Sequence, residues 1–344
     1  MKITTKEVRK VTKILNDVIS EYKEEVISKK RDWRTYEQCV ARRLKAAFVE
    51  LKPLVKKAVQ SINKVKKEKR GAKPLLTLEQ KVLTLLLKHL TCKSNREMSF
   101  MLILFSWLNG IDVSYKTIER LYSDQEVLLA LHNLHVLTLK KRRVEEIDCG
   151  GDGTGYGLTV KKHYATEVQK LKDKIKVAEL QNVGSNKARK KRNVFVYSFA
   201  IIDLKTRMYV AYGTSLKSEK EAFISAINML QKLEVKIQSI RLDKYFQQYY
   251  VEYIENIFGD VKFYIIPKKN ATIKGSWAWK KMLAFFVSDV KVFLKEYFRR
   301  NQCESIFAED KRKIGWKLGQ KRFDRIDTAN SLTALWHNLY WLID

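Results

Sequence analysis

This chain of 344 residues contains few of the residues that break, cross-link or anchor a fold. It has 3 prolines and 4 cysteines, and no two cysteines form a C-x-x-C pair. Widely separated cysteines argue against a zinc site or a disulfide framework and agree with a reducing cytosol. The longest apolar stretch, 98–108, is too short to span a bilayer, and the first residues lack the apolar segment of a signal peptide. We therefore expect a cytoplasmic protein without membrane contact.

Acidic residues are scarce relative to basic ones. The chain carries 68 Lys and Arg against 38 Asp and Glu, a formal net charge of +30. The cations occur throughout the chain, so a polyanion such as nucleic acid is the expected partner, bound largely through phosphate contacts. The alternative is a solvated, highly soluble surface. Because 45% of the residues are hydrophobic, a chain of this length can form two or three domains with cores of their own.

Residues 1–72 are expected to form a basic helical region that ends in a linker. Apolar residues recur there at helical spacing, and no glycine occurs from residue 4 to residue 69. Pro53 marks a helix start or a kink. The basic run 64–74 is closed by glycine and proline, which favours a linker that is either solvated or in contact with nucleic-acid backbone.

Residues 73–141 are expected to form a helix-turn-helix DNA-binding domain. Thr77 and Ser94 each begin a capping box, and Ser114 can cap a third helix that runs to about Tyr122. A helix, a tight turn at Asn109–Gly110 and a second helix have the spacing of that motif. The alternative is an ordinary corner between two helices. In the DNA-binding interpretation, four side chains would face the major groove: Tyr115, Lys116, Thr117 and Arg120.

From residue 142 to residue 344, the sequence pattern predicts both strands and helices, as in an α/β domain. The order is three strands, a helix, a strand, a helix, a strand and then a helical tail. That order predicts a ribonuclease-H-like domain with a mixed sheet and a site at one edge. A lysine-rich insertion is expected near 160–192. The expected strands are 144–152, 194–202, 207–212, 235–242 and 261–266, with a hairpin turn at 203–206.

Three carboxylates in this last region suggest chemistry. Asp152 and Asp243 lie in or just after predicted strands, and Glu304 lies in the pattern Y-x2-R-x3-E-x6-K, which runs from Tyr297 to Lys311. Carboxylates of this kind suit a site that holds two Mg²⁺ ions for phosphodiester chemistry. On one helix, the arginine, glutamate and lysine of the pattern lie close to one face, where cations can hold phosphate beside the metal. The alternative is an exposed helix with ordinary ion pairs.

Other polar residues compete for roles at this site. Asp148 would face the same side of the strand as Asp152, so it is not excluded, although the Gly-Thr-Gly after Asp152 allows backbone or DNA to approach closely. Glu309 and Asp310 are expected to project away from Glu304 into solvent. A further candidate, the histidine at 163, can contact DNA or assist near the metals, or it can be an ordinary surface or core residue.

Several segments resemble one known family. They are Asp-Gly-Thr-Gly-Tyr, Lys-His-Tyr, Thr-Ser-Leu-Lys-Ser-Glu, Ile-Arg-Leu-Asp, Ile-Pro-Lys-Lys-Asn-Ala-Thr and Glu-Asp-Lys-Arg-Lys. From about residue 144 to the C-terminus, the chain resembles the DDE transposases of insertion sequences that carry the Y-R-E-K signature, in a branch found in archaea. The resemblance implies that Asp152, Asp243 and Glu304 are the catalytic, metal-binding residues. It also implies that Tyr297, Arg300 and Lys311 contact or orient DNA phosphate.

The resemblance implies an enzyme that binds transposon ends, cleaves DNA and transfers the 3′-hydroxyl to target DNA. Its cofactor would be two Mg²⁺ ions, with Mn²⁺ as a substitute, and its working form on the nucleoid would be a homodimer that joins two ends. Trp277 and Trp279 lie among lysines and suit stacking on an unpaired base, although core packing explains them equally well. Two alternatives remain: a non-catalytic DNA-binding protein (a decayed transposase or a regulator), and a related two-metal nuclease or resolvase.

Overall fold

The computed structural model describes residues 3–25, 32–62, 75–104, 112–158 and 195–343. The lysine-rich insertion, the histidine at 163, the basic linker and the turn at Asn109–Gly110 lie outside these residues.

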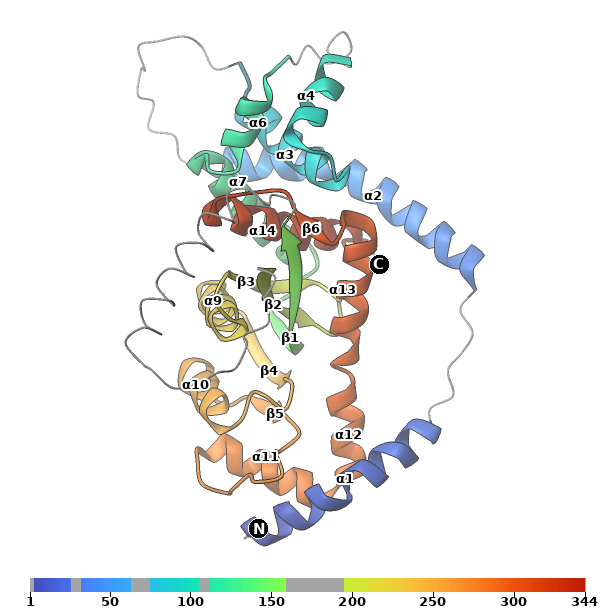
Figure 1. The fold of residues 1–344 in the computed structure, drawn as a ribbon, viewed down its shortest axis with the longest axis vertical. Helices are drawn as coiled ribbons and strands as arrows, with labels where there is room; N and C mark the ends of the chain where they lie inside the picture. The colour runs from blue at the N-terminus through green and yellow to red at the C-terminus, as the bar shows by residue number, and fades with distance from the viewer. Residues whose placement is uncertain (1–2, 26–31, 63–74, 105–111, 159–194, 344) are drawn as a thin grey trace, which may run out of the picture.

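A mixed open sheet forms the centre of the molecule, with strand order β3-β2-β1-β4-β5 and β6 paired to β1 (Figure 1). Strand β2 runs antiparallel to both β1 and β3, whereas β4 and β6 run parallel to β1 and β5 runs parallel to β4. This mixed α/β arrangement is compatible with the predicted ribonuclease-H-like domain. The strands are β1 (Glu146–Leu158), β2 (Phe195–Asp203), β3 (Tyr209–Ser215), β4 (Lys236–Arg241), β5 (Lys262–Tyr264) and β6 (Lys317–Leu318).

The strands form where aromatic and β-branched residues cluster, as in the β2 segment Phe-Val-Tyr-Ser-Phe-Ala-Ile-Ile-Asp. The predicted hairpin turn between β2 and β3 is confirmed. One carboxylate oxygen of Asp203 accepts hydrogen bonds from the backbone N–H of Thr206 at 2.8 Å and from its hydroxyl at 2.6 Å. Strand β1 is longer than expected, because it continues past Asp152 to Leu158.

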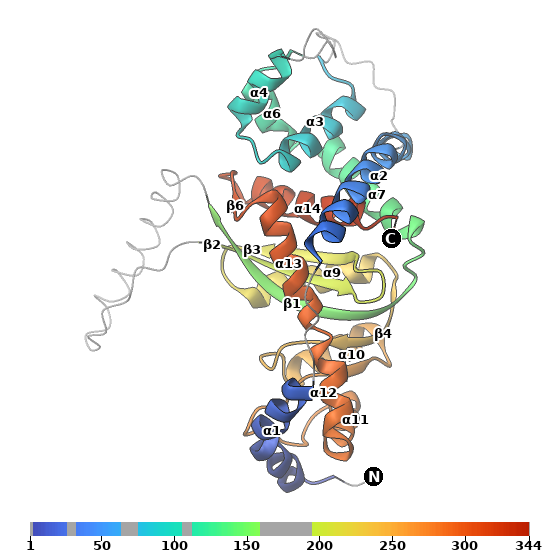
Figure 2. The same ribbon diagram turned by 90° about the vertical axis from the view of Figure 1, so that its right-hand side faces the viewer.

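Helices cover both faces of the sheet. Helix α9 (Glu219–Lys232) packs on one face, against β2 and β3. On the other face, α13 (Asn301–Ile314) crosses β1 and α14 (Phe323–Tyr340) packs on β3 (Figure 2). Figure 1 shows α12 (Val290–Phe298) and α13 following one another along one side of the sheet. Two further helices, α10 (Gln248–Phe258) and α11 (Trp277–Ser288), lie at the β5 end.

The N-terminal helices pack at opposite ends of the molecule (Figure 1). Helix α1 (Thr5–Glu25) contacts α11 and α12, whereas α2 (Trp33–Gln60), α3 (Leu78–Leu90) and α7 (Gln125–Lys141) pack against α14. Pro53 lies inside α2 rather than at its start.

The shorter helices begin at the capping residues that the sequence predicts. The capping box predicted at Thr77 is present, and Ser94 and Glu97 exchange the reciprocal bonds of a second one ahead of α4 (Asn95–Leu104). Ser114 caps α6 (Tyr115–Leu121), as expected. Within the described ranges, none of the helices combines the length and the apolar character that crossing a membrane requires.

The expectation for Glu309 and Asp310 was wrong, because both are buried. Asp310 accepts a hydrogen bond from the hydroxyl of Tyr209 at 2.7 Å, and one of its oxygens lies 2.9 Å from Nδ1 of His337. Glu309 pairs with Lys313 at 2.6 Å. Helix α13 therefore buries two acidic residues on its inner face: Lys313 on the same helix pairs with Glu309, and polar side chains from β3 and α14 contact Asp310.

Candidate active site

The side chains of Asp152 and Thr154 lie on the face of β1 that α13 crosses. Residues two apart on a strand point to the same side, about 7 Å apart. Arg300, just ahead of α13, reaches Asp152, and Lys311 near the end of that helix reaches Thr154 at 2.6 Å. The strand and the helix therefore bring the two halves of the predicted site together.

Arg300 lies between two of the predicted catalytic carboxylates. One terminal nitrogen of its guanidinium is 2.9 Å from Asp152 and the other is 3.1 Å from Glu304. The guanidinium carbon also lies 5.8 Å from the centre of the Tyr297 ring. Arg300 and Asp152 are largely buried, whereas the Glu304 side chain is 58% exposed. Of these three side chains, the glutamate is the one most open to solvent.

Asp243 follows β4 and is half-buried. Its negative charge shifts the pKa of three nearby side chains: Glu219, Tyr297 and Arg300. Burial and then the charge of Asp243 raise the pKa of Glu219. Burial raises the pKa of Tyr297, and the charge of Asp243 raises it further. Burial lowers the pKa of Arg300, but the surrounding negative charges, including that of Asp243, raise it above its ordinary value. The predicted residues therefore share one electrostatic neighbourhood.

Glu219 is a fourth carboxylate here, which the sequence reasoning missed. It is the first residue of α9, and Ser218 caps that helix. A Cβ atom built at Gly153, next to Asp152, would meet the Glu219 carboxylate, so that carboxylate lies directly against the glycine. In the sequence Glu219 looks like an ordinary acidic residue in a first helical turn. Only the pairing of β1 with its neighbours shows that it lies beside the aspartate.

The pKa of Asp152 is raised to about 6, mainly because the side chain is buried. The charge of Arg300 and a hydrogen bond from the Gly153 N–H act in the opposite direction, and the charges of Glu304 and Glu219 raise the pKa further. Burial of Asp152, together with two acidic neighbours and only one adjacent guanidinium, accounts for this raised pKa. Such a group gains stability from additional positive charge.

Asp148 has a different environment from Asp152. Its oxygens lie 2.6 Å from Arg241 and 2.7 Å from Arg299, and Ser239 also donates a hydrogen bond to it. Although burial acts in the opposite direction, the bonds from Ser239 and Arg241 lower the pKa of Asp148. Arg241 is itself buried and is paired with Glu296 on α12. Asp148 thus belongs to an ion network that joins β1 to β4 and α12.

The other sequence-predicted DNA-contact residues lie in varied positions. Trp279 is buried in the core, where its indole N–H donates to the Thr272 carbonyl at 2.9 Å, so it is not part of a surface. Trp277 is 66% exposed at the start of α11, with the Lys281 ammonium 5.9 Å from its ring. Two further predicted residues, Lys116 and Arg120, are exposed on α6.

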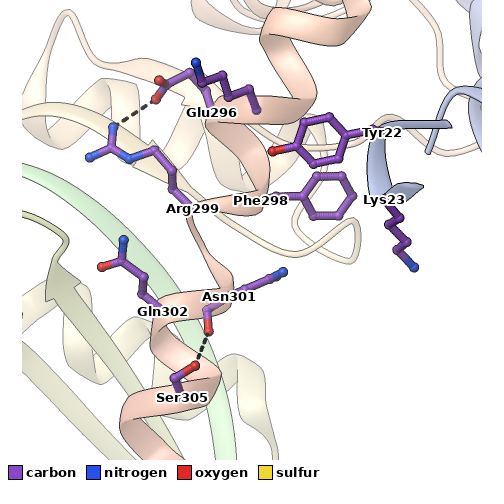
Figure 3. Close-up of a pocket in the computed structure, with 9 residues that line it drawn as sticks. Tyr22, Lys23, Glu296, Phe298, Arg299, Asn301, Gln302 and Ser305 are labelled. Atoms are coloured by element: carbon purple, nitrogen blue, oxygen red, sulfur yellow. Dashed lines mark hydrogen bonds and ion pairs between the residues drawn. The ribbon is translucent and has the colours of Figure 1, made fainter. Parts of the chain in front are cut away.

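A cavity of about 610 Å³ lies beside this site, on a neighbouring side of α12 and α13 (Figure 3). The rings of Tyr22 and Phe298 stack there at 5.3 Å, which fixes α1 against α12. Three cations line it together with Glu296 and polar side chains of α13, but none of the four carboxylates described above does. The cations are Lys23, Lys295 and Arg299. The cavity is therefore separate from the group formed by Asp152, Glu219, Asp243 and Glu304.

The donor set suits Mg²⁺ or Mn²⁺, because it consists of carboxylate oxygens. In the part of the chain that the structure describes, no three Asp, Glu, His or Cys side chains are close enough together to ligate one ion. The guanidinium of Arg300 occupies the space between Asp152 and Glu304. The chemistry of the site fits a divalent ion, and ligation by this pair requires a movement of Arg300 or Glu304.

The fold and the site define an α/β protein whose mixed sheet gathers acidic residues around β1. Comparison with known proteins agrees with the resemblance of the chain to transposases. It is 38% identical, over 341 residues, to the probable transposase for insertion sequence element ISA1214 of Archaeoglobus fulgidus. The alignment covers 98% of this chain and 97% of that relative. The chain therefore belongs to this family of insertion-sequence transposases. No family model matches it, and neither does any solved structure.

Proposed function

We propose that this protein is a DDE transposase of the Y-R-E-K class that binds the ends of its element, cleaves DNA and joins the freed 3′-hydroxyl to target DNA. One observation carries the proposal. Arg300 bridges Asp152 and Glu304, which are 152 positions apart in the sequence, and the charge of Asp243 acts on the same arginine. Family membership supports the same conclusion.

The proposed cofactor is a pair of Mg²⁺ ions held by Asp152, Asp243 and Glu304. When bound, such ions activate the attacking oxygen and stabilise the leaving one. The raised pKa of Asp152 supports this assignment, because a crowded carboxylate group favours a bound cation.

The cations beside the carboxylates have a separate role in the proposal. Arg300 and Lys311 hold phosphate oxygens of the strand to be cut, and Tyr297 positions Arg300 through its ring. Lys116 and Arg120 on α6 contact DNA away from the cut, as does Trp277 on α11. Two copies of the chain are needed to hold two ends together, so the working form is a homodimer on DNA, located on the nucleoid.

The test is Glu304→Gln, which keeps the shape of the side chain but removes its charge. We expect strand cleavage in Mg²⁺ to fall by at least about 100-fold, with binding to element ends changed less than about twofold. The control is Glu126→Gln, an equal change of charge at an exposed position in the first turn of α7. Cleavage at the native rate by the Glu304 variant would contradict the proposal.

The same assay separates the alternatives. A substrate that offers both an element end and a target duplex reports joining as well as cutting. Cleaved ends without joined target would indicate a related nuclease or resolvase. Tight binding without nicking in Mg²⁺ or Mn²⁺ would indicate a non-catalytic DNA-binding protein.

A further inference from the structure

A separate cavity of about 240 Å³ lies where the end of α3 and the start of α4 meet β6. The residues that line it come from 88–122 and 314–329, and none of the four carboxylates of the candidate active site is among them. No step of the proposed reaction uses this cavity. Its charged lining residues are Lys88, Lys93, Glu97 and Lys317.

The ammonium group of Lys88 is buried in the wall of this cavity. Lys88 is 7% exposed, and its Nζ donates a hydrogen bond to the Tyr122 hydroxyl at 2.7 Å. Among the residues that the structure describes, no carboxylate forms an ion pair with it, and burial lowers its pKa to about 8. A lysine this deeply buried is normally paired with an acidic group. Because an ammonium has three N–H donors, Lys88 has donors left for a ligand.

Gln320, just after β6, contributes a second group of donors. Its side chain is 3% exposed, and within the described ranges its Nε2 has no hydrogen-bond partner. An amide nitrogen carries two N–H donors, and a buried donor without an acceptor destabilises the fold. Lys88 and Gln320 therefore give the cavity an excess of donors and a positive charge. An oxyanion supplies the acceptors that they lack.

The charges around the cavity favour an anion as well. Lys93 and Lys317 also line it, so that three lysines stand against a single acidic residue of the described lining, Glu97. The Glu97 carboxylate is already engaged, because it accepts a hydrogen bond from the Ser94 N–H at 2.8 Å in the capping box of α4. The first turn of that helix adds positive partial charge on the same side.

We propose that this cavity is a binding site for a phosphate group, which accepts hydrogen bonds from the Lys88 ammonium and the Gln320 amide. The site goes beyond the proposed function, because it takes no part in cleavage or joining.

Asn95 indicates which form of phosphate the cavity takes. Its Oδ1 is another buried atom of the lining that has no hydrogen-bond partner among the described residues. A hydrogen phosphate ion has an O–H that can donate to this oxygen, whereas a phosphodiester of a DNA backbone has none. Free phosphate is therefore the expected ligand, and DNA is the other source of the same chemistry.

A ligand in this cavity would join two parts of the chain that already touch. The Cys92 thiol, at the end of α3, donates to the carbonyl of Ile314, the last residue of α13, at 2.7 Å. A phosphate held by both Lys88 and Gln320 adds a second link between the same segments. Binding should therefore stabilise the folded chain, which makes thermal unfolding a direct readout.

The test titrates inorganic phosphate into the full-length chain in EDTA at constant ionic strength. Calorimetry and the midpoint of thermal unfolding report binding. We expect Lys88→Met, which keeps an unbranched side chain but removes its charge, to weaken phosphate binding by at least about 10-fold. The control is Lys81→Met on the same helix, where the native side chain pairs with Asp124 away from the cavity, and a change of less than about twofold is expected. Phosphate held by exposed lysines elsewhere contributes equally to both variants.

A second variant tests the other donor without loss of the fold. Gln320→Glu keeps the shape of the side chain and places a carboxylate in the same cavity as the Lys88 ammonium. We expect this variant to unfold at the native temperature or above when phosphate is absent. Its phosphate binding should nevertheless be weaker by at least about 10-fold, because the new charge repels the anion.

DNA binding separates the two sources of phosphate. The probe is the terminal inverted repeat read from the DNA flanking the gene, bound by the native chain and by Lys88→Met with and without inorganic phosphate. If the ligand is free phosphate, both chains should bind the DNA within about twofold of each other. If the ligand is a phosphate of the DNA, Lys88→Met should bind the DNA more weakly, and inorganic phosphate should displace DNA from the native chain alone.

Two results would overturn the inference. One is equal phosphate binding by the native chain, Lys88→Met and Gln320→Glu, and the other is an equal loss of phosphate binding in Lys81→Met and Lys88→Met. Neither depends on whether Glu304→Gln abolishes cleavage, so this inference and the proposed function can fail separately.

Discussion

Asp148 and Asp152 lie on one strand, four residues apart, and have opposite environments. Two arginines and a serine hydroxyl surround Asp148, and its pKa is lowered. Asp152 has one arginine and two acidic neighbours, and its pKa is raised to about 6. The first environment stabilises a charged carboxylate without further partners, whereas the second leaves one that favours either a proton or a cation.

This difference predicts opposite dependences of stability on pH, measured in EDTA. Asp152 binds its proton more tightly in the folded chain, so its contribution to stability is complete below about pH 4 and is lost as the pH rises through about 6. Relative to the native chain, Asp152→Asn should therefore gain up to roughly 3 kcal/mol in free energy of unfolding between about pH 4 and about pH 7.5.

Asp148→Asn is the matched comparison, and its stability relative to the native chain should change with pH in the opposite direction. Because the pKa of Asp148 is lowered in the folded chain, this group stabilises the fold at a pH above its pKa in the unfolded chain, and that stabilisation is lost as the pH falls. The Asp148 variant should thus lose more stability at neutral pH than at acidic pH. Urea unfolding at several pH values measures both variants. If the free energy of unfolding of both changed with pH in the same direction relative to the native chain, the two aspartates would not have the opposite environments described here.

Glu219 predicts a second effect at the level of one side chain. If this carboxylate supports the metal-binding group, Glu219→Gln should reduce cleavage in Mg²⁺ by about 10- to 100-fold, with end binding retained. Glu221→Gln is the control on the same helix, where the native side chain accepts a hydrogen bond from Ser215. Native cleavage by the Glu219 variant would remove this residue from the site.

Among the elements, β1 and the α12–α13 pair decide the geometry of the site. Arg241 on β4 joins them: its side chain is buried, it pairs with Asp148, and its Nε donates to the Glu296 carbonyl at 2.7 Å. Loss of this arginine would leave two partly buried carboxylates without their main partner. The position of α12, and so of Arg300, depends on that contact.

Arg241→Met should therefore lower the free energy of unfolding by about 3 kcal/mol, since it breaks a buried ion network on one side. The control is Lys236→Met on the same strand, where an exposed ion pair with Glu146 is lost and a smaller change is expected. Urea unfolding at neutral pH measures both. Equal effects would show that burial of Arg241 contributes nothing beyond the exposed pair.

Across the whole molecule, α14 joins the N-terminal helices to the sheet. The indole N–H of Trp336 donates to the Leu86 carbonyl at 2.8 Å, and the His89 ring lies 3.0 Å from the Thr333 hydroxyl. The largest group of buried apolar residues extends from Val8 to Leu342. The sheet and helices of the C-terminal region therefore share their core with α2, α3 and α7.

A chain that starts at residue 142 should consequently fail to fold on its own. It would expose the side of α14 that these helices cover, and we expect aggregation or loss of cooperative unfolding. A chain of residues 32–344, which lacks only α1, is the control and should stay folded. Circular dichroism and gel filtration distinguish the outcomes, and a cooperatively folded 142–344 fragment would contradict this shared core.

Much of the secondary structure was predictable because its causes are local. The capping boxes, the hairpin turn at Asp203 and the helical spacing in α9 each involve residues within a few positions of one another. The burial of Asp310 was not predictable, since its partners Tyr209 and His337 come from β3 and α14. The same applies to Glu219, which only tertiary packing brings to Gly153.

The sequence by itself determined the composition of the site: a strongly basic chain with two strand-associated aspartates and a Y-R-E-K pattern, which the structure divides between α12 and α13. Spacing along one helix is enough to predict which of those side chains share a face. Only the tertiary structure decided that Asp148 is held by Arg241 and that Trp279 is in the core. The physical reason is that burial and charge pairing depend on contacts between segments far apart in the chain, which no local pattern records.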